Sequence, residues 1–386
     1  MKNILVSIKH ELKFQDFVRG ENCKLFDSLG NEYLDLESGV WCTSIGHCHP
    51  EISKVIFDQS SKMMHSGYCY LNPVIDNAAN KILEINKMKE GKCVFLCSGS
   101  EAVEYSIRVT NSIHHNKKIL TLHDSYLSSY GTASEKRDEN FIQFDWINND
   151  NLDIIDFSTI SAFIFEPGSS SGLVRFPPKE LIQAIIKKIK ENNGFIIINE
   201  VTTGIGRTGE WFGYNHYDIK PDMVAIGKGL GNGYPVSCTA ISKNVLSKLD
   251  MNKFYYSQSH QNDPLGAVVA KKVLEIIESD NLLAQCKVKS KLIADRLTEI
   301  KNKYGIIKEF RIRGLMIAID FLENNDVFYS EIINNELLKK KIILVLRPGF
   351  NSFRIDPALT ISKNDLIFFL DTLEDIICNL NETNTY

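Results

Sequence analysis

A lysine between two glycines is the residue of this chain best placed for covalent chemistry. Lys228 follows the apolar run of residues 223–226 and begins the glycine-rich segment 227–235. An amine that is removed from water, or that lies beside another cation, loses its proton readily and can attack a carbonyl to form an imine. A solvated lysine on a flexible surface loop is the alternative. The glycines do not form a dinucleotide-binding turn, because their spacing is wrong and Pro235 interrupts the expected helix.

Residues 98–101 offer a site for an anion. They follow the apolar run 92–97 and begin a helical pattern, and Ser98 and Glu101 have the spacing of a capping box. Gly99 permits close approach of the backbone, and the first N–H groups of a helix bind phosphate readily. An ordinary helix cap is the alternative interpretation of the same residues.

Polar residues follow a third apolar run as well. Residues 195–198 lead directly into the segment 199–209, which begins with Asn199 and contains Val201, Thr202 and Arg207. Such residues either cap the end of a strand or belong to a site. The choice depends on how the strands before these three segments are arranged.

Short apolar runs alternate with helical patterns through the centre of the chain, which predicts an α/β fold. Continuous apolar strands of this kind are typical of a mostly parallel sheet with helices on both faces, and ligands of such sheets lie outside the carboxyl ends of the strands. We expect strands at residues 92–97, 118–122, 161–165, 195–198, 223–226 and 236–241.

Other patterns extend this arrangement. Residues 25–36 predict a hairpin, and residues 179–193 predict a helix capped by Gly194. A long helix is expected near residues 264–278, and shorter mixed α and β patterns follow it. We therefore expect a large domain at residues 45–286 and a small α+β domain from residues 1–44 and 287–386.

Composition excludes several classes of protein. The 386 residues are 44% hydrophobic and carry a formal net charge of -4, with no dominant basic block, which argues against a nucleic-acid or anionic-membrane surface. The apolar run at the start is too short for a signal peptide or a membrane span. Nine cysteines without metal-type pairing indicate reduced thiols in a cytoplasmic protein, and no metal site is expected.

Taken together, the motifs resemble the class III aminotransferases, a branch of the fold-type I enzymes that use pyridoxal 5'-phosphate (PLP). The resemblance covers nearly the whole chain and keeps the order of the motifs. These are the hairpin, Gly46 to Pro50, Ser98 to Ala102, Glu166-Pro167, residues 199–209, the Lys228 loop and Arg354 to Thr360. It implies a large domain with a seven-stranded sheet.

The resemblance also implies a role for each site residue. Lys228 matches the lysine that forms an imine with PLP and later carries a proton, and Arg354 matches the arginine that binds a substrate carboxylate. Ser259 falls where the family reaches the phosphate of the neighbouring subunit, which implies a homodimer. Trp41 falls in the wall of the substrate pocket. The remaining cofactor-binding positions are Ser98, Gly99, Ser100, Tyr126 (stacked on the pyridine ring), Glu166, Asn199, Val201 and Thr202.

Asn199 departs from the family pattern. The family has an aspartate there, whose negative charge keeps the pyridine nitrogen protonated so that the ring accepts electrons from the breaking Cα–H bond. An amide supplies no such charge, so we expect slow or altered deprotonation at Cα. An engineered substitution, a natural enzyme such as a racemase, and a relative that binds PLP without turnover all remain open.

Ser171 is a second departure. Relatives that use ω-amino donors often carry a glutamate there, which pairs with the carboxylate-binding arginine during one half-reaction. Without it, we expect Arg354 to hold an amino-acid carboxylate in both half-reactions. The resemblance thus implies ping-pong transamination, with a PLP-dependent racemase or epimerase and a PLP-binding pseudoenzyme as alternatives. Arg347 is a candidate for a second carboxylate contact, and a structural role fits it equally well.

Overall fold

The computed structural model describes residues 3–5, 16–67, 69–70, 72–115, 117–134, 136, 139–322, 328–347 and 349–383. Most of the N-terminal apolar run therefore lies outside the described residues. None of the helices in the described ranges combines the length and apolar composition needed to cross a membrane. All nine cysteines lie in these ranges, and each is a free thiol.

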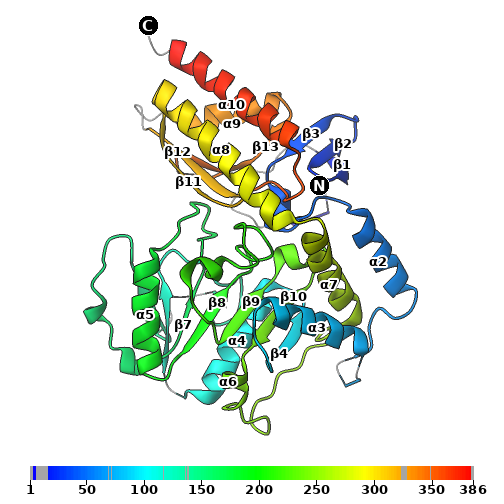
Figure 1. The fold of residues 1–386 in the computed structure, drawn as a ribbon, viewed down its shortest axis with the longest axis vertical. Helices are drawn as coiled ribbons and strands as arrows, with labels where there is room; N and C mark the ends of the chain where they lie inside the picture. Colours follow the sequence, from blue (N-terminus) through cyan, green and yellow to red (C-terminus); the bar gives the residue numbers. More distant parts are fainter. Residues whose placement is uncertain are drawn as a thin grey trace.

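A seven-stranded sheet forms the centre of the larger part of the molecule, the lower one in Figure 1, as the resemblance implies. Its strand order is β4-β10-β9-β8-β7-β5-β6, and only β10 runs antiparallel to its neighbours. Six strands match the predicted runs to within one residue, and β6 was missed because its four residues carry no clear pattern. The bounds are β4 Lys92–Leu96, β5 Lys118–Leu122, β6 Phe141–Phe144, β7 Ile160–Phe165, β8 Phe195–Asn199, β9 Met223–Ile226 and β10 Ser237–Ile241.

Alternate residues of the strands build two separate cores. In β8, Phe195 and Ile197 belong to the core beneath helix α4 (Gly99–Ile113), whereas Ile196 and Ile198 belong to the larger core on the opposite face. That face is covered by α5 (Lys179–Glu191) and α7 (Pro264–Ser279), and α3 (Pro73–Ile85) and α2 (Pro50–Ser60) pack against α7. Burial on both sides explains why the strand sequences are apolar throughout.

Helix α5 ends differently from the prediction. Its C-terminal cap is Asn192, and the left-handed residue that follows is Asn193, with φ of 61°. The Gly194 N–H donates a hydrogen bond to the Ile189 carbonyl (2.9 Å), so Gly194 closes the helix end without a positive φ. Asparagine tolerates the left-handed region better than most residues, which is why it can take this position.

A second structural part combines both ends of the chain. The predicted hairpin is present as β2 (Lys24–Asp27) and β3 (Glu32–Asp35), and β13 (Ile342–Ile343) joins β3 in parallel. Another antiparallel sheet has the order β11-β12-β15-β14, and helices α8, α9 and α10 pack on this part (Figure 1). The remaining bounds are β1 Phe17–Glu21, β11 Ile307–Arg313, β12 Met316–Phe321, β14 Val345–Leu346, β15 Ser352–Ile355, α8 Leu282–Tyr304, α9 Tyr329–Lys339 and α10 Lys363–Thr383.

A buried arginine links this part to the central sheet. Arg207 lies in the loop after β8, and its Nη1 donates to the carbonyls of Leu315 (3.0 Å) and Pro357 (2.5 Å). Gly314, at the β11–β12 turn, has φ of 60° and packs on the backbone of residues 207 and 208. The backbones of the two parts are thus in direct contact at this turn.

This contact predicts that Gly314→Ala destabilises the fold by about 3 kcal/mol or more. The new methyl group would meet the Thr208 carbonyl carbon at 2.4 Å, which is backbone that cannot move aside, in addition to the strain of a left-handed alanine. The matched control is Gly305→Ala, which has φ of 68° but open space around it and should cost only about 1 kcal/mol. Denaturant unfolding of both variants measures the difference, and equal losses would contradict the packing argument.

Candidate active site

A cavity of about 1490 Å³ lies at the carboxyl ends of the central strands. Four of the predicted site residues line it, although they come from distant parts of the chain: Trp41, Tyr126, Lys228 and Arg354. The strand ends supply Tyr126 and Lys228, whereas Trp41 and Arg354 come from the part built by the chain ends. The cavity is therefore bounded by both parts of the molecule.

Lys228 points into this cavity from the end of β9. Its Nζ lies 3.3 Å from the Thr202 hydroxyl, and its backbone has a left-handed φ of 44°. Burial lowers the pKa of the Lys228 amine, while the negative charge of Glu166 acts in the opposite direction. An amine with a lowered pKa spends more time in its neutral, nucleophilic form.

Tyr126 is held by its backbone on both sides. Its N–H donates to the Glu166 carboxylate (2.7 Å), and its carbonyl accepts from Asn199 Nδ2 (3.0 Å). The amide oxygen of Asn199 in turn accepts from the Val201 N–H (3.2 Å). These two neighbours determine the orientation of the Asn199 amide, because one offers only an acceptor and the other only a donor. The ring of Tyr126 is left exposed on the cavity wall.

Glu166 is buried beneath this segment. Burial raises the pKa of its carboxyl group to about 7, although hydrogen bonds from Ser170 and from the Tyr126 backbone lower it in part. Lys136, which the sequence did not single out, also lines the cavity and donates to the carbonyls of His123 (3.1 Å) and Ser125. Burial lowers the pKa of the Lys136 amine.

The turn before α4 has the predicted capping box. Ser98 accepts from the Glu101 N–H, and the Glu101 carboxylate accepts from the N–H groups of residues 97 and 98. The N–H groups of Gly99 and Ser100 make no hydrogen bond within the described ranges. The hydroxyls nearby pair with each other, Ser98 with Tyr130 (2.8 Å) and Ser100 with Ser129 (3.0 Å).

The turn before α4 packs closely against the residue before Lys228, and the contact involves Gly99, Val201 and Gly227. A Cβ on Gly99 would meet the Val201 side chain at 2.5 Å, and one on Gly227 would meet the Gly99 Cα at 3.2 Å. A side chain at position 99 would therefore require Val201 to move, and one at position 227 would be tight against the Gly99 backbone. The two free N–H groups and the lysine consequently lie close together.

Trp41 and Arg354 line the cavity from the part of the molecule built by the chain ends. The Arg354 guanidinium carbon lies 3.5 Å from the centre of the indole ring, and Lys228 Nζ lies 5.7 Å from it. Trp41 ends the turn Ser38–Trp41, in which all four residues have φ between 49° and 65°. Such a left-handed turn is rare for residues other than glycine, and Val40 is the most unfavourable of them because it is β-branched.

Asp356 is a site residue that the sequence analysis missed. It is fully buried, and its carboxylate accepts from Arg354 Nε at 2.7 Å. Burial raises the pKa of Asp356 to about 6, although Arg354 and Arg207 act in the opposite direction. Arg354 therefore has an acidic partner at Nε, which the sequence analysis did not anticipate. The alternation of residues along a strand could have indicated this pair, since positions 354 and 356 lie on one face.

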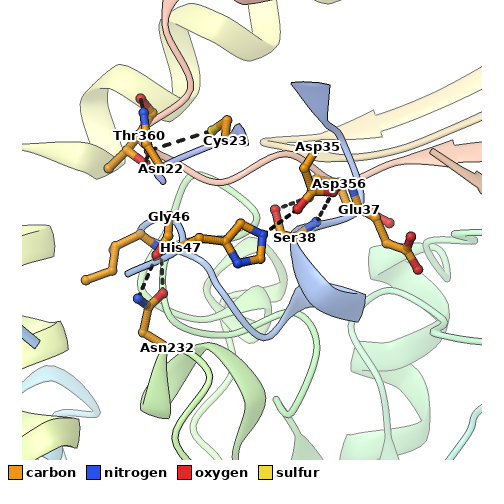
Figure 2. A network of polar contacts seen from close by, with 11 residues as sticks. Asn22, Cys23, Asp35, Glu37, Ser38, Gly46, His47, Asn232, Asp356 and Thr360 are labelled. Atoms are coloured by element: carbon orange, nitrogen blue, oxygen red, sulfur yellow. Dashed lines mark hydrogen bonds and ion pairs between the residues drawn. The ribbon is translucent and has the colours of Figure 1, made fainter. Parts of the chain in front are cut away.

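A polar network connects these walls (Figure 2). The Asp35 carboxylate accepts from the N–H groups of Glu37 and Ser38 and pairs with His47 (2.7 Å), so His47 has a structural partner. The Ser38 hydroxyl donates to the Asp356 carbonyl (2.7 Å). Asn232, in the glycine-rich loop after Lys228, bonds to the backbone of residues 45 and 46. The segment of residues 35–47 thus contacts the loop that follows Lys228, through Asn232, and the chain just after Arg354, through the Asp356 carbonyl.

Ser259 lies apart from these residues. Its side chain is exposed, and it is not among the residues that line the cavity. Its neighbour Gln258 contacts Cys97, which directly precedes the Ser98 turn (3.9 Å). Within the described ranges of a single chain, Ser259 therefore has no direct contact with the cavity.

Comparison with solved structures shows the same fold. An acetylornithine aminotransferase from Elizabethkingia anophelis superimposes with a TM-score of 0.85 at 23% identity and covers 97% of this chain and 96% of its own. A taurine:2-oxoglutarate aminotransferase from Bifidobacterium kashiwanohense, in complex with PLP and glutamate, gives a TM-score of 0.90 at 18% identity, with 99% and 96% covered.

Comparison of sequences shows the family. A succinylornithine transaminase from Citrobacter koseri is 29% identical over 376 residues, which cover 92% of this chain and 90% of that protein. The family model for aminotransferase class-III matches residues 7–141 and 148–377. Because this match extends over most of the sequence, the chain belongs to the class-III aminotransferases, which are PLP-dependent transaminases.

Proposed function

We propose that this aminotransferase moves an amino group between an amino acid, whose carboxylate binds Arg354, and an oxo acid or aldehyde by a ping-pong mechanism. The observation that supports it best is the shared cavity, which both Lys228 and Arg354 line. A substrate between them would present its carboxylate to the guanidinium and its Cα to the amine.

The residues around Lys228 fit PLP. The unpaired N–H groups of Gly99 and Ser100, at the N-terminus of a 15-residue helix, suit a phosphate, and the exposed Tyr126 ring suits an aromatic partner. When bound, PLP supplies an electron sink for the breaking Cα–H bond. We assign Ser98, Gly99, Ser100, Tyr126, Glu166, Asn199, Val201 and Thr202 to its binding.

Lys228 then acts as the proton carrier. Its lowered pKa favours the neutral amine, which is the form that can accept the Cα proton, and the Thr202 hydroxyl 3.3 Å away can orient it. Trp41 supports the substrate carboxylate indirectly, because Arg354 stacks on its ring and is held at Nε by Asp356. The two Nη groups of Arg354 remain for a bidentate contact.

We also propose the homodimer, with Ser259 reaching the phosphate site of the partner subunit. The exposure of Ser259 and the lack of any contact with the cavity of its own chain support this role. We also propose a large domain at residues 45–286. A cytoplasmic location is proposed as well, because free thiols are typical of proteins in a reducing compartment.

Arg354→Gln should raise the KM for amino-acid substrates by about tenfold to hundredfold, because a charged hydrogen bond to the carboxylate is lost. Arg296→Gln is the matched control, since Arg296 lies on α8 and pairs with acidic side chains of α10. Steady-state kinetics with several amino acids measures both variants. An unchanged KM in Arg354→Gln would show that Arg354 does not bind the substrate carboxylate.

Asn199→Asp should speed the half-reaction by about tenfold or more, because a carboxylate supplies the charge that holds a proton on the ring nitrogen. The variant should also unfold at a lower temperature, since the carboxylate cannot donate to the Tyr126 carbonyl. Stopped-flow absorbance after mixing with an amino donor gives the rate. If the rate does not rise, the charge at position 199 does not limit this enzyme.

Covalent attachment of PLP to the apoenzyme should reach half its maximal rate below pH 10.4, the usual pKa of lysine. The neutral amine is the reactive form, and burial lowers the pKa of Lys228. Glu166→Gln removes a charge that raises this pKa, so its midpoint should fall further. Glu200→Gln is the control, since Glu200 is equally buried but does not affect Lys228. Absorbance measured against pH gives the midpoints, and a Glu166→Gln midpoint at or above the wild-type value would contradict this assignment.

A further inference from the structure

Two histidines share one carboxylate outside the cavity. His65 follows helix α2, and His260 and Asp263 belong to the turn before α7. The Oδ1 atom of Asp263 lies 2.5 Å from His65 Nδ1, and its Oδ2 atom lies 2.6 Å from His260 Nδ1. The centres of the two imidazole rings are 4.9 Å apart. The three side chains are separate from the residues that line the cavity described above.

These side chains bring three possible metal ligands to one point. The two nitrogens and a carboxylate oxygen all lie within 4.8 Å of one another. Zinc takes such ligands at about 2.0–2.2 Å in a tetrahedron, which places neighbouring ligand atoms about 3.3 Å apart. The two contacts of Asp263 would therefore lengthen by about 0.7–0.8 Å, and the proton of each neutral imidazole would reside on Nε2. The side chains of His65 and His260 are 42% and 59% exposed, so they can rotate to make this adjustment.

The turn that carries two of these ligands is held by the central sheet. The Asn262 N–H donates to the carbonyl of Phe95 in β4 (2.9 Å), and the Asn262 side-chain oxygen accepts from the Phe95 N–H (2.9 Å). The His260 N–H donates to the Gln258 side chain (2.8 Å). Asp263 is the N-cap residue of α7, but its carboxylate contacts the imidazoles instead of capping the helix. Ligands that are fixed before binding lose less entropy when the metal arrives.

The donor atoms indicate which class of metal fits. Imidazole nitrogen suits zinc, copper and nickel, whereas Mg²⁺ and Ca²⁺ prefer ligand sets built from oxygen. Two imidazoles and one carboxylate are a set that zinc uses in proteins, with a fourth position for water. Sequence spacing did not indicate this set, because His65 and Asp263 are 198 positions apart.

We propose that His65, His260 and Asp263 bind a zinc ion, which fastens the segment after α2 to the turn before α7. This site goes beyond the proposed transamination and does not depend on it. Ser259 directly precedes His260, so the ion would also fix the position of the Ser259 segment. Because the three ligands converge only in the folded chain, zinc binding should stabilise the folded state.

Calorimetric titration of the holoenzyme with Zn²⁺ tests this site. We expect one ion per chain whose binding depends on all three side chains. Each of His65→Gln, His260→Gln and Asp263→Asn should weaken it by at least about tenfold. The matched control is His115→Gln, which removes an exposed imidazole just after α4 and should keep the wild-type affinity. Mg²⁺ in place of Zn²⁺ should give no saturable heat.

Thermal unfolding gives a second readout. Zn²⁺ should raise the melting temperature of the wild type and of His115→Gln, and it should leave that of His260→Gln unchanged. A wild type without saturable Zn²⁺ binding would show a hydrogen-bonded cluster only and would overturn the assignment. Wild-type affinity in both His65→Gln and His260→Gln would overturn it as well, because the ion would then bind elsewhere. Both imidazoles are exposed, so these replacements leave the core intact, which circular dichroism of the variants checks.

Discussion

One indole ring lies beside two basic side chains of the cavity. Trp41 lies 3.5 Å from the Arg354 guanidinium carbon and 5.7 Å from Lys228 Nζ. Burial lowers the pKa of the Lys228 amine, and the positive charge of Arg354 lowers it further. Asp356 compensates Arg354 from the protein side. The cavity wall can thus hold an anion while Lys228 remains able to act as a base.

This arrangement depends on a strained backbone. Four consecutive residues, Ser38–Trp41, have left-handed φ angles, at a cost of about 1–2 kcal/mol for each residue other than glycine. The Asp35 carboxylate accepts from the N–H groups at the start of the turn, and the Ser38 hydroxyl donates to the Asp356 carbonyl (Figure 2). The Trp41 ring is buried. Strain of this kind persists only where the surroundings hold it, and it is found at functional sites.

The hydrogen bonds of Tyr126 suggest why position 199 is an asparagine. Its side chain must donate to one backbone group and accept from another, and an amide can do both. An ionised aspartate would place an oxygen against the Tyr126 carbonyl. Glu166, held from the other side of Tyr126, is buried with a pKa of about 7. The amide at position 199 therefore holds the Tyr126 backbone in place, whereas an ionised carboxylate could not make both contacts.

The sequence by itself determined the strands, the capping box at Ser98 and the chemistry available to Lys228, because apolar runs, cap spacing and glycine positions act over a few residues. The fold class followed from the alternation of these runs and the order of the motifs. The short strand β6 lacked such a pattern. Only the tertiary structure decided which residues meet. Asn199 holds a carbonyl 73 positions away, and Arg347 shares a face with Arg354 because of strand register. The left-handed turn carrying Trp41 is stable only through distant contacts, which no local pattern records.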